Sequence, residues 1–73
     1  MSNIYYVVLR FGIFHSVKRC NVGTVPRGGE PYNVARDRMQ EQYPTAAMVG
    51  FFGREDYAET RAEKLNSLTL TKI

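Results

Sequence analysis

The chain has 73 residues, 44% of them hydrophobic, and a formal net charge of +3 with its one histidine neutral. We expect one domain over residues 1–73, because a chain of this length has no room for a second hydrophobic core. No stretch approaches the roughly 20 apolar residues that span a bilayer. The single cysteine, Cys20, cannot form an internal disulfide, and the first residues lack the basic region of a signal peptide. These features predict a protein of the cytoplasm without a membrane segment.

The positive charge is concentrated in the first half of the sequence. Residues 1–38 contain six basic and two acidic side chains, whereas residues 39–73 contain four basic and five acidic ones. Such an asymmetry is typical of a positive surface that meets phosphate or an acidic protein. The alternative is a solvated basic face that only improves solubility.

A long apolar run, Asn3 to Phe14, dominates the N-terminal region. Its β-branched and aromatic residues favour a strand over a helix. Side chains of a strand alternate between its faces, so one face should carry Tyr5, Val7, Leu9 and Phe11. The other face should carry Ile4, Tyr6, Val8 and Arg10. We expect the first set to form the core.

Strand-like character continues from Ile13 to Val22, after Gly12. Two interpretations remain open here: a hairpin that turns near Gly12, or one continuous strand bent by a glycine bulge. The next segment, Gly23 to Pro31, contains enough glycine and proline to predict a loop. It matches neither of the glycine patterns that bind nucleotide phosphates, so we expect a connector.

A helix is predicted from Pro31 to about Tyr43, because proline suits the first helical turn. Its apolar stripe consists of Tyr32, Ala35, Met39 and Tyr43. Arg36 and Arg38 either form a positive patch on this helix or belong to a solvated face.

The apolar run Thr45 to Phe52 predicts a strand, and its small residues, including Gly50, favour a central strand that a helix approaches closely. A second helix should begin at Glu55 or Asp56 and end near Leu65, with Asn66 as its stop. Its inward stripe consists of Ala58, Ala62 and Leu65. Residues 67–73 alternate in polarity, which predicts a short edge strand or a loose tail.

These elements predict an α+β fold with the order β-β-α-β-α and a possible short final strand or loose C-terminal tail. We expect a small mixed or antiparallel sheet with both helices packed on one face. The other face of the sheet would then be exposed, with Tyr6, Val8 and Arg10 among its residues.

The sequence offers few groups for catalysis. His15 and Cys20 are the only histidine and cysteine, and on one strand their positions point to opposite faces. A structural zinc site takes about four Cys or His ligands, which the chain does not have. We therefore predict no enzyme, no catalytic residue, no metal site and no cofactor.

A binding function is the remaining prediction, supported by five tyrosines and seven arginines. The tyrosines also serve to complete a small core, with Tyr5, Tyr32 and Tyr43 inside and Tyr6 more exposed. The run Arg10-Phe11-Gly12-Ile13-Phe14 only loosely resembles an RNA-recognition motif, so weak or no direct nucleic-acid binding is expected. The candidate protein-binding residues are Ile4, Tyr6, Val8, Arg10, Lys18 and Arg19.

The opening stretch Met-Ser-Asn-Ile-Tyr-Tyr-Val-Val-Leu-Arg-Phe, together with the chain length, resembles a small RNA-polymerase-binding transcription regulator of a lytic Xanthomonas phage. The resemblance implies an inhibitor of initiation by host RNA polymerase that also causes antitermination at intrinsic terminators. The implied partner is the N-terminal region of the β′ subunit, near the RNA exit channel, and the resemblance implies no catalysis and no cofactor. We expect the free protein to be a monomer. The rival hypothesis is a repressor-like nucleic-acid-binding protein, and a third is a toxin–antitoxin partner or a phage inhibitor of another host protein.

Overall fold

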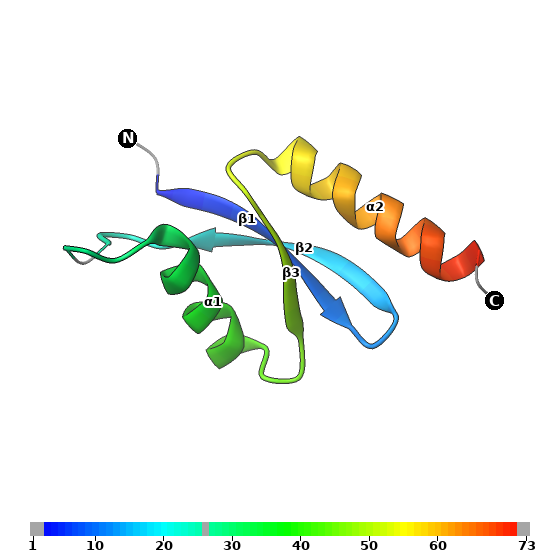
Figure 1. Ribbon diagram of the computed structural model, residues 1–73, viewed down its shortest axis with the longest axis horizontal. Coiled ribbons are helices and arrows are strands. Elements are labelled where there is room, and N and C mark those ends of the chain that lie inside the picture. Colours follow the sequence, from blue (N-terminus) through cyan, green and yellow to red (C-terminus); the bar gives the residue numbers. More distant parts are fainter. Residues whose placement is uncertain (1–2, 26, 72–73) are drawn as a thin grey trace.

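The computed structural model describes residues 3–25 and 27–71, and these form three strands and two helices (Figure 1). The elements are β1 (Ile4–Phe11), β2 (Phe14–Asn21), α1 (Pro31–Gln42), β3 (Ala47–Phe52) and α2 (Glu55–Thr71). Both pairings in the sheet are antiparallel. The predicted α+β class and the order β-β-α-β-α are therefore confirmed.

Strands β1 and β2 form a hairpin that turns at Gly12 and Ile13, with Phe11 paired to Phe14. The φ angle of Gly12 is +64°, in the left-handed region, whereas Ile13 does not have a positive φ. Glycine at the first of two turn residues matches a type II′ turn, whose twist suits the flanking strands. The hairpin interpretation is correct, and the continuous bent strand is wrong.

The strand order is β2-β1-β3, so β1 is central and β3 lies at an edge. The prediction of a central strand at Thr45 to Phe52 is wrong. Gly50 does permit a close approach, but the approaching group comes from the neighbouring strand. A Cβ at Gly50 would lie 3.1 Å from the Cβ of Val8 and 2.9 Å from the Phe52 ring. Pairing shifts by one residue between Val8–Gly50 and Leu9–Met48, which leaves Val49 as the extra residue of a bulge.

The helices cover opposite faces of the sheet, so the prediction that both pack on one face is wrong (Figure 1). Helix α1 buries Ala35 and Met39 in the cluster that contains Val7 and Leu9 of β1. Helix α2 buries its small residues in a second cluster around Val8. The physical reason is that a central strand with apolar side chains at consecutive positions must be covered on both sides.

Helix α2 continues to Thr71, beyond the predicted stop at Asn66. The predicted final strand or loose tail is wrong for residues 67–71, while residues 72–73 lie outside the described part of the chain. No glycine or proline follows Asn66 to break the helix, and the Asn66 side chain is bonded to the hairpin instead of capping the helix. The predicted inward stripe of α2 is confirmed, since Ala58 and Ala62 are buried and Leu65 packs against them.

Aromatic rings add to the contact between α1 and the sheet. The rings of Tyr5 and Phe51 stack with centroids 4.7 Å apart, and Tyr32 meets Phe51 edge-on at 5.5 Å. Phe11 and Tyr43 form a similar edge-on pair at 5.7 Å. Tyr32 nevertheless remains 43% exposed, so its predicted interior position is wrong. It stands in the first turn of α1, where only the edge of its ring reaches the sheet.

Candidate protein-binding surface

The predicted binding face of β1 is covered by α2. Val8 is 0% exposed and packs in one cluster with Ala58 and Ala62. Tyr6 is half-buried at the border of the same cluster, and Ile4 is also half-buried. The expectation of an exposed face with Val8 on it is therefore wrong, because the second helix occupies this face instead of joining the first. Val8 cannot contact a partner in this fold.

Arg10 and Arg19 are exposed as expected, but Lys18 lies on the other face of the sheet. In the register of the hairpin Arg19 pairs with Tyr6, whereas Lys18 pairs with Val7. Adjacent residues of a strand point to opposite faces. The Lys18 Nζ atom lies 5.4 Å from the ring centroid of Tyr43, on the α1 side. The six predicted residues thus do not form one continuous surface.

His15 and Cys20 lie on opposite faces of β2, as the sequence predicted, because His15 pairs with Arg10 and Cys20 with Tyr5. Cys20 is 2% exposed within the α1-side cluster. This burial raises the pKa of its thiol, and the nearby Arg38 guanidinium partly opposes the shift. His15 is also buried, on the α2 side.

The Asn66 side chain joins α2 to the hairpin through His15. The backbone N–H of His15 donates to Asn66 Oδ1 at 2.7 Å, and Asn66 Nδ2 donates to the His15 carbonyl at 3.0 Å. The ring Nδ1 of His15 lies 3.1 Å from the same Oδ1 atom. Asn66 thereby binds both outward backbone groups of His15, as an added strand would. These contacts fix the turn of the hairpin relative to the C-terminal half of α2.

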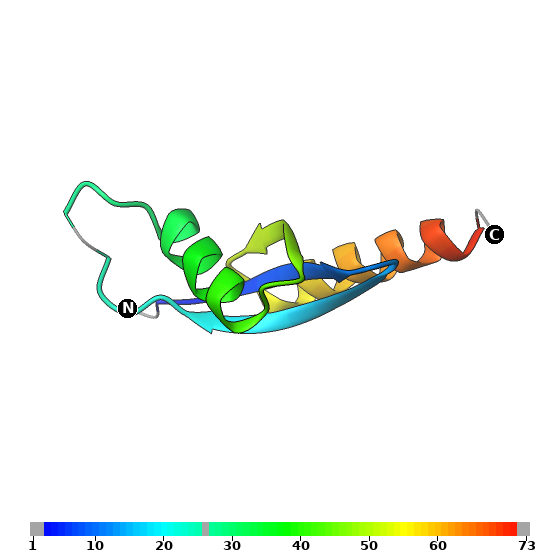
Figure 2. The same cartoon turned by 90° about the horizontal axis from the view of Figure 1, so that it is seen from below.

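Three large apolar side chains are exposed at this end of the molecule. Ile13 is 67% exposed, Phe14 is 59% exposed and Leu68 is 51% exposed. Figures 1 and 2 both show the hairpin turn beside the C-terminal half of α2. Phe14 precedes His15 and pairs with Phe11, so its side chain lies on the α1 face of the sheet, opposite α2. We call Ile13, Phe14 and Leu68 the hairpin-end patch, a set of exposed side chains that share this end of the molecule across both faces of the sheet. The exposed side chain of Arg10, which pairs with His15, lies beside it.

Sequence reasoning missed the hairpin-end patch. Ile13 and Phe14 were assigned to the strand region, and Leu68 to a strand or tail. One available signal was the apolar Ile13 immediately after Gly12, because tight turns usually carry polar residues. The proximity of Leu68 had no signal, since it depends on a helix that continues past Asn66.

Neither helix, over the residues described, has the length and apolar character needed to cross a membrane. Comparisons of the chain with models of protein families, with curated proteins and with solved structures find no match.

Proposed function

We propose that this protein is a phage-encoded transcription regulator that binds host bacterial RNA polymerase through the hairpin-end patch. In this role it inhibits initiation and promotes antitermination at intrinsic terminators. The observation that supports the proposal is a set of large apolar side chains that are all exposed at one end of the molecule, on a rigid support. Ile13, Phe14 and Leu68 come from two elements that the His15–Asn66 hydrogen bonds fix together.

Exposed apolar side chains that are concentrated at one end of a molecule mark protein interaction sites more than scattered ones do. The hairpin-end patch has the additional advantage of a fixed geometry, because less conformational entropy is lost when a preorganised surface binds. Arg10 supplies a positive charge at its border, which favours a partner with acidic residues around an apolar centre. This combination supports a protein partner.

The identity of that partner comes from the resemblance of the opening stretch to the phage regulators. It points to the N-terminal region of the β′ subunit near the RNA exit channel. We propose that the protein acts there as a monomer in the host cytoplasm, without a cofactor and without catalysis of its own. Direct nucleic-acid binding should be weak, because a net charge of +3 neutralises few phosphates.

The test is retention of purified variants on immobilised Xanthomonas RNA polymerase, after nuclease treatment, with thermal unfolding measured in parallel. The double variant Ile13→Asn, Leu68→Gln should fold and lose at least about tenfold in affinity, since central apolar contacts dominate binding energy. Tyr57→Gln is the matched control, because Tyr57 is 56% exposed at the other end of α2. It should bind normally.

A second pair of variants tests the charge at the patch. Arg10→Glu should weaken retention and relieve inhibition of initiation in a transcription assay. Arg19→Glu carries the same charge change away from the patch and should have little effect. Full retention of both the apolar double variant and Arg10→Glu would contradict the proposal. Nuclease-sensitive retention would favour the nucleic-acid-binding alternative instead.

A further inference from the structure

The outer edge of β3 is open. β3 borders only β1 in the sheet, and no described residue forms a hydrogen bond with Ala47–Phe52 from the other side. In an antiparallel pair, backbone groups of alternate residues point toward the partner strand and away from it. The two-residue hairpin directs the backbone groups of Val7 toward β2, so its partner Phe51 presents its N–H and C=O to the open edge. Val49, the extra residue of the bulge, is 42% exposed at the same edge.

The other edge of the sheet, along β2, is covered at its hairpin end. There the Asn66 side chain already occupies the outward N–H and C=O of His15. Edge strands are commonly protected from further pairing by such a cover. Val17 and Arg19 of β2 also present their N–H and C=O outward, and no described residue forms a hydrogen bond with these groups. The edge at β3 is distinguished by the two grooves that lie beside it.

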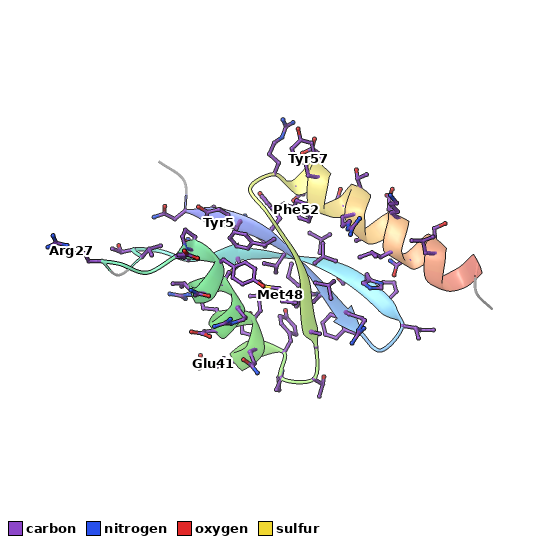
Figure 3. All side chains as sticks on the ribbon, viewed as in Figure 1. Tyr5, Arg27, Glu41, Met48, Phe52 and Tyr57 are labelled. Atoms are coloured by element: carbon purple, nitrogen blue, oxygen red, sulfur yellow. The ribbon has the colours of Figure 1, made fainter. Side chains whose placement is uncertain are left out.

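A groove lies between β3 and the side of α1. It measures about 290 Å³, and its floor is apolar, with Leu9, Met39 and Met48. Figure 3 labels Met48, which belongs to β3. Arg36 lines the groove as well, and its one ion pair within the described part of the chain is a long one of 3.8 Å to Asp37, with both side chains largely exposed. This groove suits an apolar side chain.

A second groove, of about 430 Å³, lies on the α2 side of β3. Phe52 and Tyr57, labelled in Figure 3, line one part of it, and Arg61 and Lys64 line another. Its one carboxylate, Asp56, accepts two hydrogen bonds of 3.1 Å from Arg54, which offset its charge. Arg61 and Lys64 form no ion pair with any residue in the described part of the chain. This groove suits an acidic side chain.

We propose that β3 accepts an added strand from another protein, an extended segment in which apolar and acidic residues alternate. Side chains of a strand point alternately to the two faces of the sheet. The apolar residues would enter the α1-side groove and the acidic residues would meet Arg61 and Lys64. Backbone hydrogen bonds to the open edge supply affinity in this mode, and the grooves supply selectivity. The inference is independent of the polymerase proposal, because it uses a different surface.

Single-stranded nucleic acid is the other ligand that Phe52, Tyr57, Arg61 and Lys64 would suit on composition alone. A nucleic acid, however, has no alternating backbone N–H and C=O groups to pair with Phe51. It also carries no apolar side chain for the groove at Leu9 and Met48. A peptide strand can therefore bind the open edge and both grooves, whereas a nucleic acid can bind only the groove on the α2 side.

The probe is a capped peptide of alternating Val and Glu, about as long as the six-residue β3, titrated into the isotope-labelled full chain. Its binding should shift the backbone amide signals of Val49 and Phe51 and slow the hydrogen exchange of the Phe51 amide. Two further peptides carry N-methyl groups on alternate residues: one on every Val amide and the other on every Glu amide. One of these two sets of methyl groups should abolish binding and the other should not, because only alternate N–H groups of an added strand face its partner.

A charge variant tests the α2-side groove. Arg61→Glu should weaken the Val–Glu peptide by about tenfold, whereas Arg27→Glu, the same change at the loop tip, should leave its affinity within about twofold. A peptide of alternating Val and Lys should not bind wild-type protein. The proposal is overturned if the Val–Glu peptide fails to bind, if both N-methylated peptides bind or both fail, or if Arg27→Glu weakens binding as much as Arg61→Glu. Tighter binding of a single-stranded oligonucleotide at the same amides would also overturn it.

Discussion

The carboxamide of Asn66 bonds to the N–H and the C=O of His15, so a side chain of α2 completes the edge of β2. The two residues are 51 positions apart in the sequence. Their contact connects the first turn of the molecule to its last helix and keeps the hairpin-end patch together. It also covers the edge of β2 at the hairpin end.

Asn66→Ala should lower the free energy of unfolding by about 1–3 kcal/mol, because it leaves two partly buried backbone groups of His15 without partners. Urea denaturation measures the change. Asn33→Ala is the control, since Asn33 is an exposed residue of α1. Equal stability of the two variants would show that the Asn66 contact contributes little.

Gly50→Ala should destabilise the fold by about 1–3 kcal/mol through overpacking against Val8. The backbone of Gly50 does not have a positive φ, so the cost is steric and not conformational. The Phe52 ring and the Val8 Cβ stay in place in Val8→Ala, which removes only the contact with Val8 Cγ2 at 3.1 Å. Combining the two changes should therefore cost less than their sum, by at least about 0.5 kcal/mol. Strictly additive effects in a double-mutant cycle would contradict this explanation.

Ala58→Leu should cost about 1–3 kcal/mol, because Ala58 is 0% exposed where α2 packs on Val8. Glu59→Leu places the same side chain at the next, exposed position and should change stability by less than about 0.5 kcal/mol. Thermal unfolding of both variants gives the comparison. Similar melting temperatures would mean that α2 is not closely packed on the sheet.

Because burial raises the pKa of Cys20, the free energy of unfolding should change with pH in the alkaline range. Above the ordinary thiol value of 9.0 the unfolded chain loses this proton while the folded protein keeps it, so the free energy of unfolding falls as pH rises. Below that value the contribution is fully present. Cys20→Ala removes the group, and between neutral and alkaline pH it should lose less stability than the wild type. Parallel pH profiles of the two proteins would be the contrary result.

Periodicity predicted the order of elements and the inner residues of both helices. Ala35 and Met39 in α1, and Ala58 and Ala62 in α2, recur at helical spacing because each helix buries one stripe. The hairpin at Gly12 was one of two interpretations, and only pairing in space decided between them.

The faces of the sheet could not be assigned in the same way. Val7 and Val8 are both apolar, so alternation along β1 does not say which side each helix covers. The position of β3 at the edge depends on which strand pairs with which, a property of the whole chain. Part of the candidate site could be predicted from the sequence, since the period of two along a strand already places Lys18 and Arg19 on opposite faces.

The division of the core into two layers also sets an order for folding. The β1–β2 hairpin is local, so we expect it to form early, whereas the layer around Val8 is complete only when α2 docks at the end of the described chain. Until then Val8, Val17 and Phe52 face water next to an unpaired strand edge, the kind of surface on which partly folded chains aggregate. We expect the yield of refolding to fall with protein concentration, and more steeply for variants that slow the docking of α2.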